Sequence, residues 1–521
     1  MKKNWHIRPH DPALIAALGR EANVPPLVAQ LLICRGISNS QQAISFLQPK
    51  LSGLRDPEEL PGGAAAADLV HEAIASGKKI VIYGDYDVDG MTSTAILLRC
   101  LEVLGADADY YIPHRIDEGY GLNDAAIESL ADDGAEVIIT VDCGIASLGE
   151  AEIAKKRNVR LIISDHHQPG ETLPDAAAIV HPMLPGSNYP FTGLAGAGVA
   201  FKLAWAICQR ASGSKKVAPR MKQFLVEAVG LATLGTIADV VPLVDENRML
   251  VRSGLELSLR EHPTTGVAAM MQVCGVTPGS RLMSEDIGFK IAPRLNAAGR
   301  LGQARLAVEL LVTRDEDRAK ELAQYIDGLN EQRQKLERSI QKSAVHQINE
   351  QFDPENDPAL VLADRGWHQG VIGIVAGRLS ERFHRPVVML SMDQMGVKPA
   401  VGSARGIPGV DLYRALESCA DLLEGFGGHA HAAGLQILEN RIDRFRASLC
   451  EYVASQWTDE ERAPDLYIDA EFPFSAFSPQ TIHQIEWLAP FGQANRRPVL
   501  CTTATELAEE PKLIGAGGRH L

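Results

Sequence analysis

The chain has 521 residues, more than one hydrophobic core usually supports, and a scale of one domain per ~150 residues predicts roughly three or four domains. A hydrophobic fraction of 45% and a charged fraction of 22% are typical of a globular protein and exclude a disordered or fibrous chain. The 66 Asp and Glu against 51 Lys and Arg give a formal net charge of -15. This balance argues against a protein that coats nucleic acid through bulk positive charge, so a polyanionic partner would have to bind in a local groove.

Features that report on the cellular compartment favour a soluble cytoplasmic protein. The eight cysteines include no CxxC pair, which is typical of reduced thiols rather than of a zinc site or a disulfide framework. The N-terminal sequence MKKNWHIRPH is basic but lacks the apolar core of a signal peptide, so export is not expected. The uncharged stretch 176–201 contains three prolines and is excluded as a membrane helix.

The first part of the chain changes from helical to alternating patterns. Residues 1–58 read as a helical extension, in which PPLVAQLLICRG and SQQAISFLQP have helical spacing and Ser40 is a candidate cap. Beyond it, helical segments precede the apolar runs KIVIYGD, EVIITVD and VRLIISD. This alternation predicts an α/β domain with a parallel sheet over residues 59–313.

The second part begins with a long uninterrupted helical pattern. Residues 314–352 contain apolar residues at spacings of three, four and seven, and they predict one connecting helix. The turn cluster DPENDP opens a second, smaller α/β domain over 353–460. Residues 461–521 read as a partial β-rich module, too short for a closed barrel, which suggests an incomplete C-terminus.

Acidic and imidazole side chains follow three of the predicted strands. In a parallel sheet the carboxyl ends of the strands share one edge, where ligands bind, so these groups should converge. Any one acid there could simply cap the next helix, but seven such side chains favour an active site. Alternation in DYDVDG should place its acids on one side of an extended segment, with Gly90 allowing a close turn. The seven are Asp85, Asp87, Asp89, Asp142, Asp165, His166 and His167.

The composition of this edge points to divalent cations. Carboxylate and imidazole ligands without thiolates favour Mn²⁺ or Mg²⁺ over structural zinc. Several carboxylates within reach of one another would repel severely unless cations neutralised them, and two ions are the simplest solution. Such a pair is suited to phosphodiester hydrolysis.

Six motifs occur in order over residues 60–500, and together they resemble a known family. They are GDYDVDG at 84–90, VDCGI at 141–145, SDHH at 164–167, GTIADVVPL at 235–243, RLNAAGR at 294–300 and GGHAHAAG at 427–434. The set resembles the DHH phosphoesterase superfamily and, within it, the bacterial RecJ family of single-stranded-DNA-specific exonucleases. DHH alone would be a weak signal, whereas the ordered combination is specific.

The resemblance implies a role for each site residue. Asp142 would bridge two ions, with Asp89, His166 and Asp239 completing one ion's ligands and Asp87, together with Asp85, holding the other. Asp165 would orient an imidazole, and His167 would face the scissile phosphate. Asp239 is chosen only because of the resemblance. Cys143 stands where Asn is more usual, and its side chain should point away from the site.

Residues that would hold the substrate come from two regions. The second α/β domain resembles the DHH-associated domain, in which Ser403, Arg405 and His429 would contact phosphate. The motif RLNAAGR supplies Arg294, Asn296 and Arg300, and IPHRIDEGYG supplies Arg115. The alternatives are that the glycines serve tight turns and that each arginine forms a surface salt bridge.

The expected activity is 5′-to-3′ removal of mononucleotides from single-stranded DNA in recombination and repair, with two Mn²⁺ or Mg²⁺ ions. The tail resembles the start of an OB-fold, in which Phe491, Arg496 and Arg497 would contact the strand. A helicase and a single-strand DNA-binding protein are the protein partners that the resemblance suggests. Two alternatives stay open: a phosphodiesterase of short oligonucleotides or cyclic dinucleotides, and a non-catalytic replication scaffold.

Overall fold

The structure is a computed structural model that describes residues 3–115, 117–119, 121–277, 279–353, 357–456, 465–506 and 508–513. The chain divides into two compact units. One comprises Met1–Pro49, Ala463–Phe491 and Asn495–Leu521, and the other comprises Lys50–Arg462 with Gly492–Ala494. Among the described helices, none has the length and apolar character needed to cross a bilayer.

The larger unit contains the predicted parallel sheet. Its five strands have the order β3-β2-β4-β5-β6, and every neighbouring pair is parallel. The two central strands, β2 and β4, are buried along their whole length, as expected for a sheet covered on both faces. The strands are β2 (Ile80–Gly84), β3 (Ala108–Tyr111), β4 (Val137–Val141), β5 (Arg160–Ser164) and β6 (Ala178–Val180).

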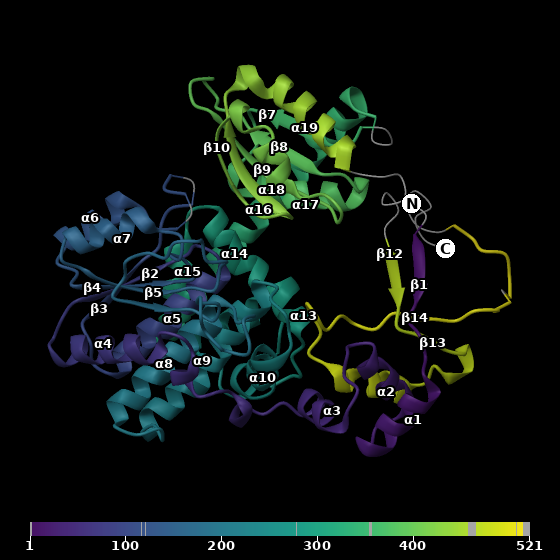
Figure 1. Ribbon diagram of the computed structural model, residues 1–521, viewed down its shortest axis with the longest axis horizontal. Helices are drawn as coiled ribbons and strands as arrows, with labels where there is room; N and C mark the ends of the chain where they lie inside the picture. The colour runs from purple at the N-terminus through teal and green to yellow at the C-terminus, as the bar shows by residue number, and fades with distance from the viewer. Residues whose placement is uncertain are drawn as a thin grey trace. The chain divides into compact units, whose positions relative to one another are not determined.

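Helices cover both faces of this sheet (Figure 1). One face packs against α6 (Asp124–Asp132) and α7 (Leu148–Lys156). The other face packs against α4 (Gly63–Ala75), α5 (Val88–Val103) and α8 (Gly196–Ser212), and α9 (Pro219–Ala238) packs on α5 and α8. Cys143 is buried in the core beneath α6 and α7, so its side chain points to the α6/α7 face, as the sequence predicts.

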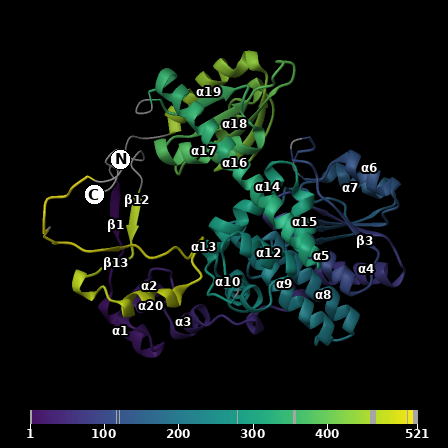
Figure 2. The same cartoon turned by 180° about the vertical axis from the view of Figure 1, so that it is seen from behind.

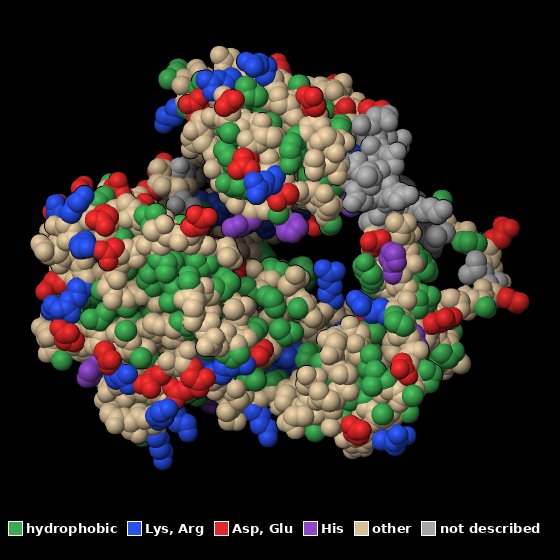
Figure 3. Space-filling view, in the orientation of Figure 1, with side chains coloured by type: hydrophobic (Ala, Val, Ile, Leu, Met, Phe, Trp, Pro, Cys, Tyr) green, Lys and Arg blue, Asp and Glu red, His purple; other side chains and the backbone are tan. Residues whose placement is uncertain are grey.

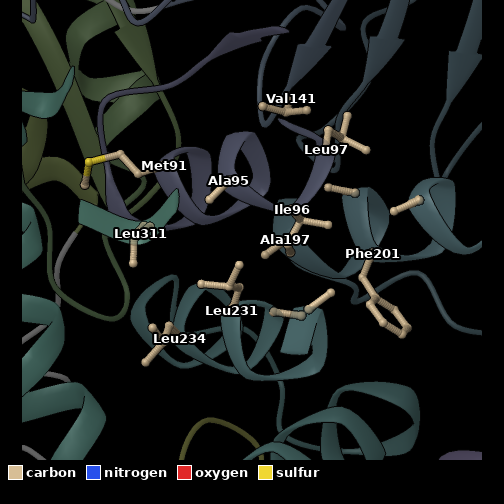
Figure 4. Packing of buried hydrophobic residues seen from close by; sticks show 14 of the residues in the cluster. Met91, Ala95, Ile96, Leu97, Val141, Ala197, Phe201, Leu231, Leu234 and Leu311 are labelled. Carbon is tan, nitrogen blue, oxygen red and sulfur yellow. The ribbon is translucent and has the colours of Figure 1, made fainter. Parts of the chain in front are cut away.

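Helices α5, α8 and α9 form the centre of the main core (Figure 4). Met91 and Ala95 of α5 and Leu231 and Leu234 of α9 belong to this cluster. Helices α5 and α9 run antiparallel, since the start of α5 lies at the end of α9 and Arg99 pairs with Glu227 at the opposite ends. A Cβ built on Gly235 would lie 2.6 Å from the Cβ of Ala197 and 2.5 Å from Thr92 Oγ1. Glycine is therefore required where the three helices meet.

A long helix links the two α/β parts of this unit, as predicted. Helix α16 (Glu316–Gln351) runs from α14 and α15 toward α17 (Figure 2). Leu322 and Ile326 pack into the core of the parallel-sheet part, whereas Ile340 and Ile348 pack into the second part. The other helices before it are α10 (Asp245–Ser253), α11 (Leu259–Glu261), α12 (Thr265–Val273), α13 (Ser284–Asp286), α14 (Ala292–Arg300) and α15 (Ala304–Val312).

The second part is built on a mixed five-stranded sheet of order β10-β11-β9-β8-β7. Strands β7 and β8 are parallel, and the remaining neighbours are antiparallel. Its strands are β7 (Leu360–Asp364), β8 (Val387–Ser391), β9 (Ala400–Arg405), β10 (Leu423–Gly428) and β11 (Ala432–Ile437). Its helices are α17 (Gln369–Phe383), α18 (Leu412–Glu417) and α19 (Ile442–Gln456).

The smaller unit joins the two ends of the chain. Strand β1 (Asn4–Ile7) pairs in parallel with β12 (Asp465–Ile468), and Leu31 and Leu488 share one core. The helix at Ser40 is capped by Asn39 rather than by Ser40, because the Asn39 carboxamide accepts from the backbone N–H of Gln42. Its other elements are α1 (Pro12–Glu21), α2 (Pro26–Ile33), α3 (Ser40–Leu47), α20 (Pro479–Ile485), β13 (Ala470–Glu471) and β14 (Leu500–Cys501).

The close approach at Gly235 leads to a stability prediction. Gly235→Ala should destabilise the fold by about 1–3 kcal/mol, because the added methyl group overpacks the junction of α5, α8 and α9. Gly328→Ala on α16 is the matched control: nothing lies within 4 Å of its Cβ, so better helix propensity should raise stability by about 0.5–1 kcal/mol. Denaturant unfolding measures both. Equal stability of the two variants would contradict the proposed crowding.

Candidate functional site

Three neighbouring strands of the parallel sheet end at the same level. The register pairs Gly84 with Val141 and Val141 with Ser164, so the carboxyl ends of β2, β4 and β5 lie side by side. The residues that follow them are Asp85, Asp142 and Asp165, and none is more than 2% exposed. Burying carboxyl groups at one sheet edge costs free energy unless each group is hydrogen-bonded or paired with a positive charge.

The segment after β2 turns directly into helix α5. Asp87 is the N-cap residue, and its Oδ1 accepts from the backbone N–H of Gly90 at 3.0 Å. The expected alternation of acids along an extended segment is therefore wrong, because capping by Asp87 starts the helix at Val88. Asp89 reaches the site from the first helical turn instead. Gly90 permits this turn, since a Cβ there would lie 2.6 Å from the Cβ of Asp85.

Asp239 is supplied by the C-terminal end of helix α9 rather than by the end of a strand. It is the C-cap residue of that helix, and the next residue, Val240, has a φ of 60°. A β-branched residue in the left-handed region is strained, as is common at functional sites. Asp142 also has a positive φ, of 62°. The two unusual backbone conformations flank the same group of side chains.

These elements bring together the six predicted metal ligands. The six side chains are called the Asp–His cluster here. Three overlapping sets of possible ligand atoms occur, each with all atoms within 4.8 Å of one another. Asp142 and His166 each belong to two sets, as shared ligands would. The sets are Asp85, Asp87 and Asp142; Asp89, His166 and Asp239; and Asp142, His166 and His167.

The donor atoms of the Asp–His cluster fit divalent cations. His166 Nε2 lies 3.0 Å from Asp142 Oδ1, 3.6 Å from Asp239 Oδ2 and 3.7 Å from Asp89 Oδ2. Within the part of the chain that the structure describes, this buried nitrogen makes no hydrogen bond, and neither does Asp85 Oδ1. Buried oxygens and an imidazole nitrogen that converge in this way are suited to Mn²⁺ or Mg²⁺.

The electrostatics of the cluster lead to the same conclusion. Burial, followed by the charge of Asp87, raises the pKa of Asp85 to about 8. Burial and the same neighbour raise the pKa of Asp239 to about 7. Burial and neighbouring carboxylates also raise the pKa of Asp89 and Asp142 well above the usual range. Cations would remove this penalty by replacing protons.

The two adjacent histidines have opposite electrostatic environments. Burial and the charge of His167 lower the pKa of His166 to about 4, so His166 is neutral at pH 7 and suited to hold a metal. Burial alone would lower the pKa of His167, but a 2.7 Å hydrogen bond with Asp165 and nearby carboxylates raise it to about 9. His167 is therefore cationic, while Asp165 stays ionised with a pKa of about 2, because hydrogen bonds outweigh its burial.

The N-terminus of α8 holds Asp89 in place, which the sequence did not indicate. The backbone N–H groups of Gly196 and Ala197 donate to Asp89 at 2.6 and 2.8 Å. A Cβ on Gly196 would lie 2.7 Å from Asp142 Oδ1, so only glycine fits. The run of small residues GLAGAG was the available signal, but helix packing explains such runs equally well.

Three of the predicted substrate-binding arginines gather near the cluster; they are called the arginine group here. The pKa of Arg300 is lowered to about 10, first by burial and then by the positive charges of Arg115 and Arg405. Arg405 donates to Ser403 Oγ at 3.0 Å, and Arg115 stacks over the ring of Tyr86. Because these positive charges repel one another, an anion bound between them would stabilise all three side chains.

The other predicted substrate contacts are placed differently. Asn296 Oδ1 accepts from the backbone N–H of Val88 at 3.3 Å, and thereby supports the start of α5. His429 is exposed at the β10–β11 hairpin. Arg294 donates to Asp327 at 2.7 Å and to the carbonyl of Lys290. Its pairing with Asp327 is the salt-bridge alternative that the sequence left open for this arginine.

The expectation that Phe491 stacks on nucleic-acid bases is wrong. Its ring is 5% exposed, because it belongs to the core that joins the two chain ends. Arg497 lies over that ring and pairs with Glu486, while the carbonyl of Arg496 accepts from Arg35. Exposed aromatic rings in the same unit are provided instead by Trp5, Tyr467 and Phe474.

Comparisons with known proteins agree with this geometry. The DHH family, N-terminal domain, matches residues 79–236, the DHHA1 domain matches 356–455, and the RecJ OB domain matches 468–521. The single-stranded-DNA-specific exonuclease RecJ of Dickeya dadantii is 37% identical over 91% of this chain and 83% of its own length. The chain belongs to the RecJ family.

Two further RecJ proteins extend the comparison. The Bacillus subtilis RecJ is 41% identical over the whole chain, which spans 64% of the length of that relative. The Mn²⁺ complex of Thermus thermophilus RecJ has a TM-score of 0.82 at 33% identity, covering 97% of this chain and 71% of that chain. The fold class predicted from the sequence is thus confirmed, including the OB domain match at the C-terminal end.

The raised pKa values predict how stability depends on pH without metal. The folded chain keeps a proton on Asp85 up to about pH 8, whereas the unfolded chain loses it near pH 4. Because the folded state binds more protons in this window, its stability falls as pH rises. Asp85→Asn removes the contribution of Asp85 to this dependence, so its unfolding temperature should exceed the parent's increasingly from pH 5 to 8 in chelator. A constant difference between the two proteins would contradict the assignment.

The contact at Gly196 predicts a loss of metal affinity. Gly196→Ala should weaken Mn²⁺ binding by about 10- to 100-fold, because the added Cβ displaces the Asp142 carboxylate. Titration calorimetry measures the affinity. Gly149→Ala is the control, since nothing lies within 4 Å of its Cβ and its affinity should be unchanged. Wild-type affinity in Gly196→Ala would refute the close approach.

Proposed function

We propose that this chain is a divalent-metal-dependent exonuclease that removes 5′-mononucleotides from single-stranded DNA in the 5′-to-3′ direction, in recombination and repair. The observation that carries the proposal is the Asp–His cluster beside the arginine group. The printed name of the RecJ relatives, single-stranded-DNA-specific exonuclease, supports the substrate and the reaction.

The metal ligands are proposed as the sequence indicated. Asp142 would be shared by the two ions, Asp89, His166 and Asp239 would hold one of them, and Asp85 and Asp87 would hold the other. When bound, such ions stabilise the charge on a phosphoryl group and activate water for in-line displacement of the 3′ oxygen. The protein's own contribution is to hold the carboxylates against their mutual repulsion, through Gly196, Ala197 and Gly90.

His167 and the arginine group are proposed to hold the strand. A cationic His167, held by its hydrogen bond with Asp165, would donate a hydrogen bond to the scissile phosphate. Arg115, Arg300 and Arg405 would hold the phosphate at the 5′ end, with Ser403 beside Arg405. His429 is proposed as a further contact from the β10–β11 hairpin. Arginine suits this task because its planar fork donates two parallel hydrogen bonds to one phosphate.

Local recognition is consistent with the charge of the whole protein. On the face shown in Figure 3, basic side chains are scattered among acidic ones rather than gathered in a belt. Single-stranded DNA would therefore be bound locally at the arginine group. The smaller unit, taken by itself, offers the exposed rings of Trp5, Tyr467 and Phe474 for base stacking. These rings replace the Phe491 platform expected from the sequence.

The cellular setting is proposed from the thiols and the family. All eight cysteines are free, and Cys100 and Cys208 remain thiols with their sulfurs 3.9 Å apart, which suits the reducing cytoplasm. A helicase that unwinds duplex and a single-strand DNA-binding protein are the proposed partners, because the substrate must first be made single-stranded.

Digestion of end-labelled oligonucleotides tests the proposal. With Mn²⁺, a 5′-labelled single strand should release labelled mononucleotide first, while duplex is spared and chelator stops the reaction. Asp142→Asn should lower turnover by about a thousandfold or more, because the shared ligand is lost, yet leave strand binding largely intact. Asp175→Asn, an exposed acid that pairs with Lys155, is the control and should act as the parent does.

Three results would overturn the proposal. Release from the 3′ end would contradict the polarity, and a preference for dinucleotides over long strands would favour the short-substrate phosphodiesterase. Strand binding without any metal-dependent cleavage would favour the scaffold.

A further inference from the structure

A second polar pocket lies at the end of α5 and α9 remote from the Asp–His cluster; it is called the distal pocket here. Asp89 and Arg99 are separated by ten residues of α5, or about 15 Å, and Asp239 and Arg220 by nearly the whole of α9, or about 28 Å. The pocket has a volume of about 380 Å³, within the range of small-molecule sites. Nothing in the proposed exonuclease reaction uses it.

The lining of the distal pocket has a net positive charge. Arg99, Arg220 and Arg314 contribute three cations, and Glu227 contributes one anion. Arg99 is paired with Glu227 at 2.5 Å, and Arg314 with Glu102 at 3.1 Å. No ion pair of Arg220 is found within the described part of the chain, and its side chain is exposed at the pocket. Arg220 is therefore the cation available to a ligand.

Two buried polar groups that line the distal pocket have no hydrogen-bond partner among the described residues. They are Arg99 Nε and Thr264 Oγ1, and each of these residues is only 7% exposed. A buried donor without a partner costs about 1–3 kcal/mol, so such groups in a native fold call for a water, an ion or a ligand. Both groups belong to residues that line the pocket.

The N-terminus of α12 faces the same space. Thr264 is its N-cap residue, but the hydroxyl group makes no capping hydrogen bond, and Thr265 in the first turn also lines the pocket. The first N–H groups of the helix thus lack a side-chain cap, and the helix dipole favours a negative charge there. Helix N–H groups, a threonine hydroxyl and two arginines thus belong to residues that line one pocket. Such an arrangement suits the four oxygens of a tetrahedral phosphate better than the two of a planar carboxylate.

We propose that the distal pocket binds the phosphate group of a small anion, either inorganic phosphate or a phosphate monoester, at a site separate from the Asp–His cluster. Arg99 Nε, Thr264 Oγ1 and Arg220 donate to the phosphate oxygens, together with the N–H groups at the start of α12. Glu227 keeps Arg99 in place through their ion pair.

Phosphate binding to the metal-free full chain tests this assignment. In chelator at constant ionic strength, inorganic phosphate should raise the unfolding temperature and bind in titration calorimetry, whereas acetate should not. Arg220→Gln should weaken the affinity about tenfold or more, because a charge-assisted hydrogen bond is lost. Adenosine 5′-monophosphate distinguishes the two sources: equal affinity indicates recognition of phosphate alone, and tighter binding indicates a monoester.

Two further variants show whether phosphate binds at the distal pocket or at the arginine group. Thr264→Val keeps the shape and removes the unpaired hydroxyl, so it should reduce phosphate affinity without lowering stability in the absence of phosphate. Arg405→Gln weakens the arginine group, so the phosphate binding that remains in this variant should still depend on Arg220 and Thr264. The proposal is overturned if Arg405→Gln abolishes the phosphate effect while Arg220→Gln and Thr264→Val keep it. It is equally overturned if acetate matches phosphate, or if only an oligonucleotide binds.

Discussion

The mutual repulsion of buried carboxylates at one edge of a parallel sheet is the constraint on which this structure depends. Asp85, Asp89 and Asp142 are almost fully buried and lie within ligand distance of His166 or of each other. Burial and mutual repulsion raise the pKa of all three carboxyl groups, so ionising them together is unfavourable without cations. The fold supplies the rigidity that keeps them together, and the ions supply the attraction.

Several elements each contribute one fixed point to the site. The carboxyl ends of β2, β4 and β5 provide the acids of the sheet edge, α5 provides Asp89, and α9 provides Asp239. Small residues make the approaches possible, since any side chain larger than glycine at positions 90, 196 or 235 would displace a carboxylate or a helix. The left-handed conformations of Asp142 and Val240 show that local backbone strain is tolerated to reach this geometry.

Local signals explain how much of the site the sequence revealed. Acids that directly follow apolar strands identify Asp85, Asp142 and Asp165, because strand pairing brings neighbouring strand ends together. Asp239 could not be found that way, since its position depends on the length of α9 and its antiparallel packing on α5. The same is true of Gly196, whose backbone reaches Asp89 from a helix more than a hundred residues along the chain.

Long-range packing also explains the wrong expectations. Phe491 looked available for base stacking, but a core formed by both ends of the chain buries it. Arg294 and Arg300 lie in one motif, yet the pairing of Arg294 with Asp327 on α16 separates their roles. The long helix itself was predictable, because its apolar spacing is a local property of the sequence, although its participation in two cores was not.

Anomalous diffraction from crystals soaked in Mn²⁺ is the most direct measurement of whether the Asp–His cluster is a metal centre. Two manganese peaks should appear, both contacting Asp142, with His166 and Asp239 on one and Asp85 and Asp87 on the other. Manganese bound elsewhere on the protein, with the Asp–His cluster empty, would contradict the account.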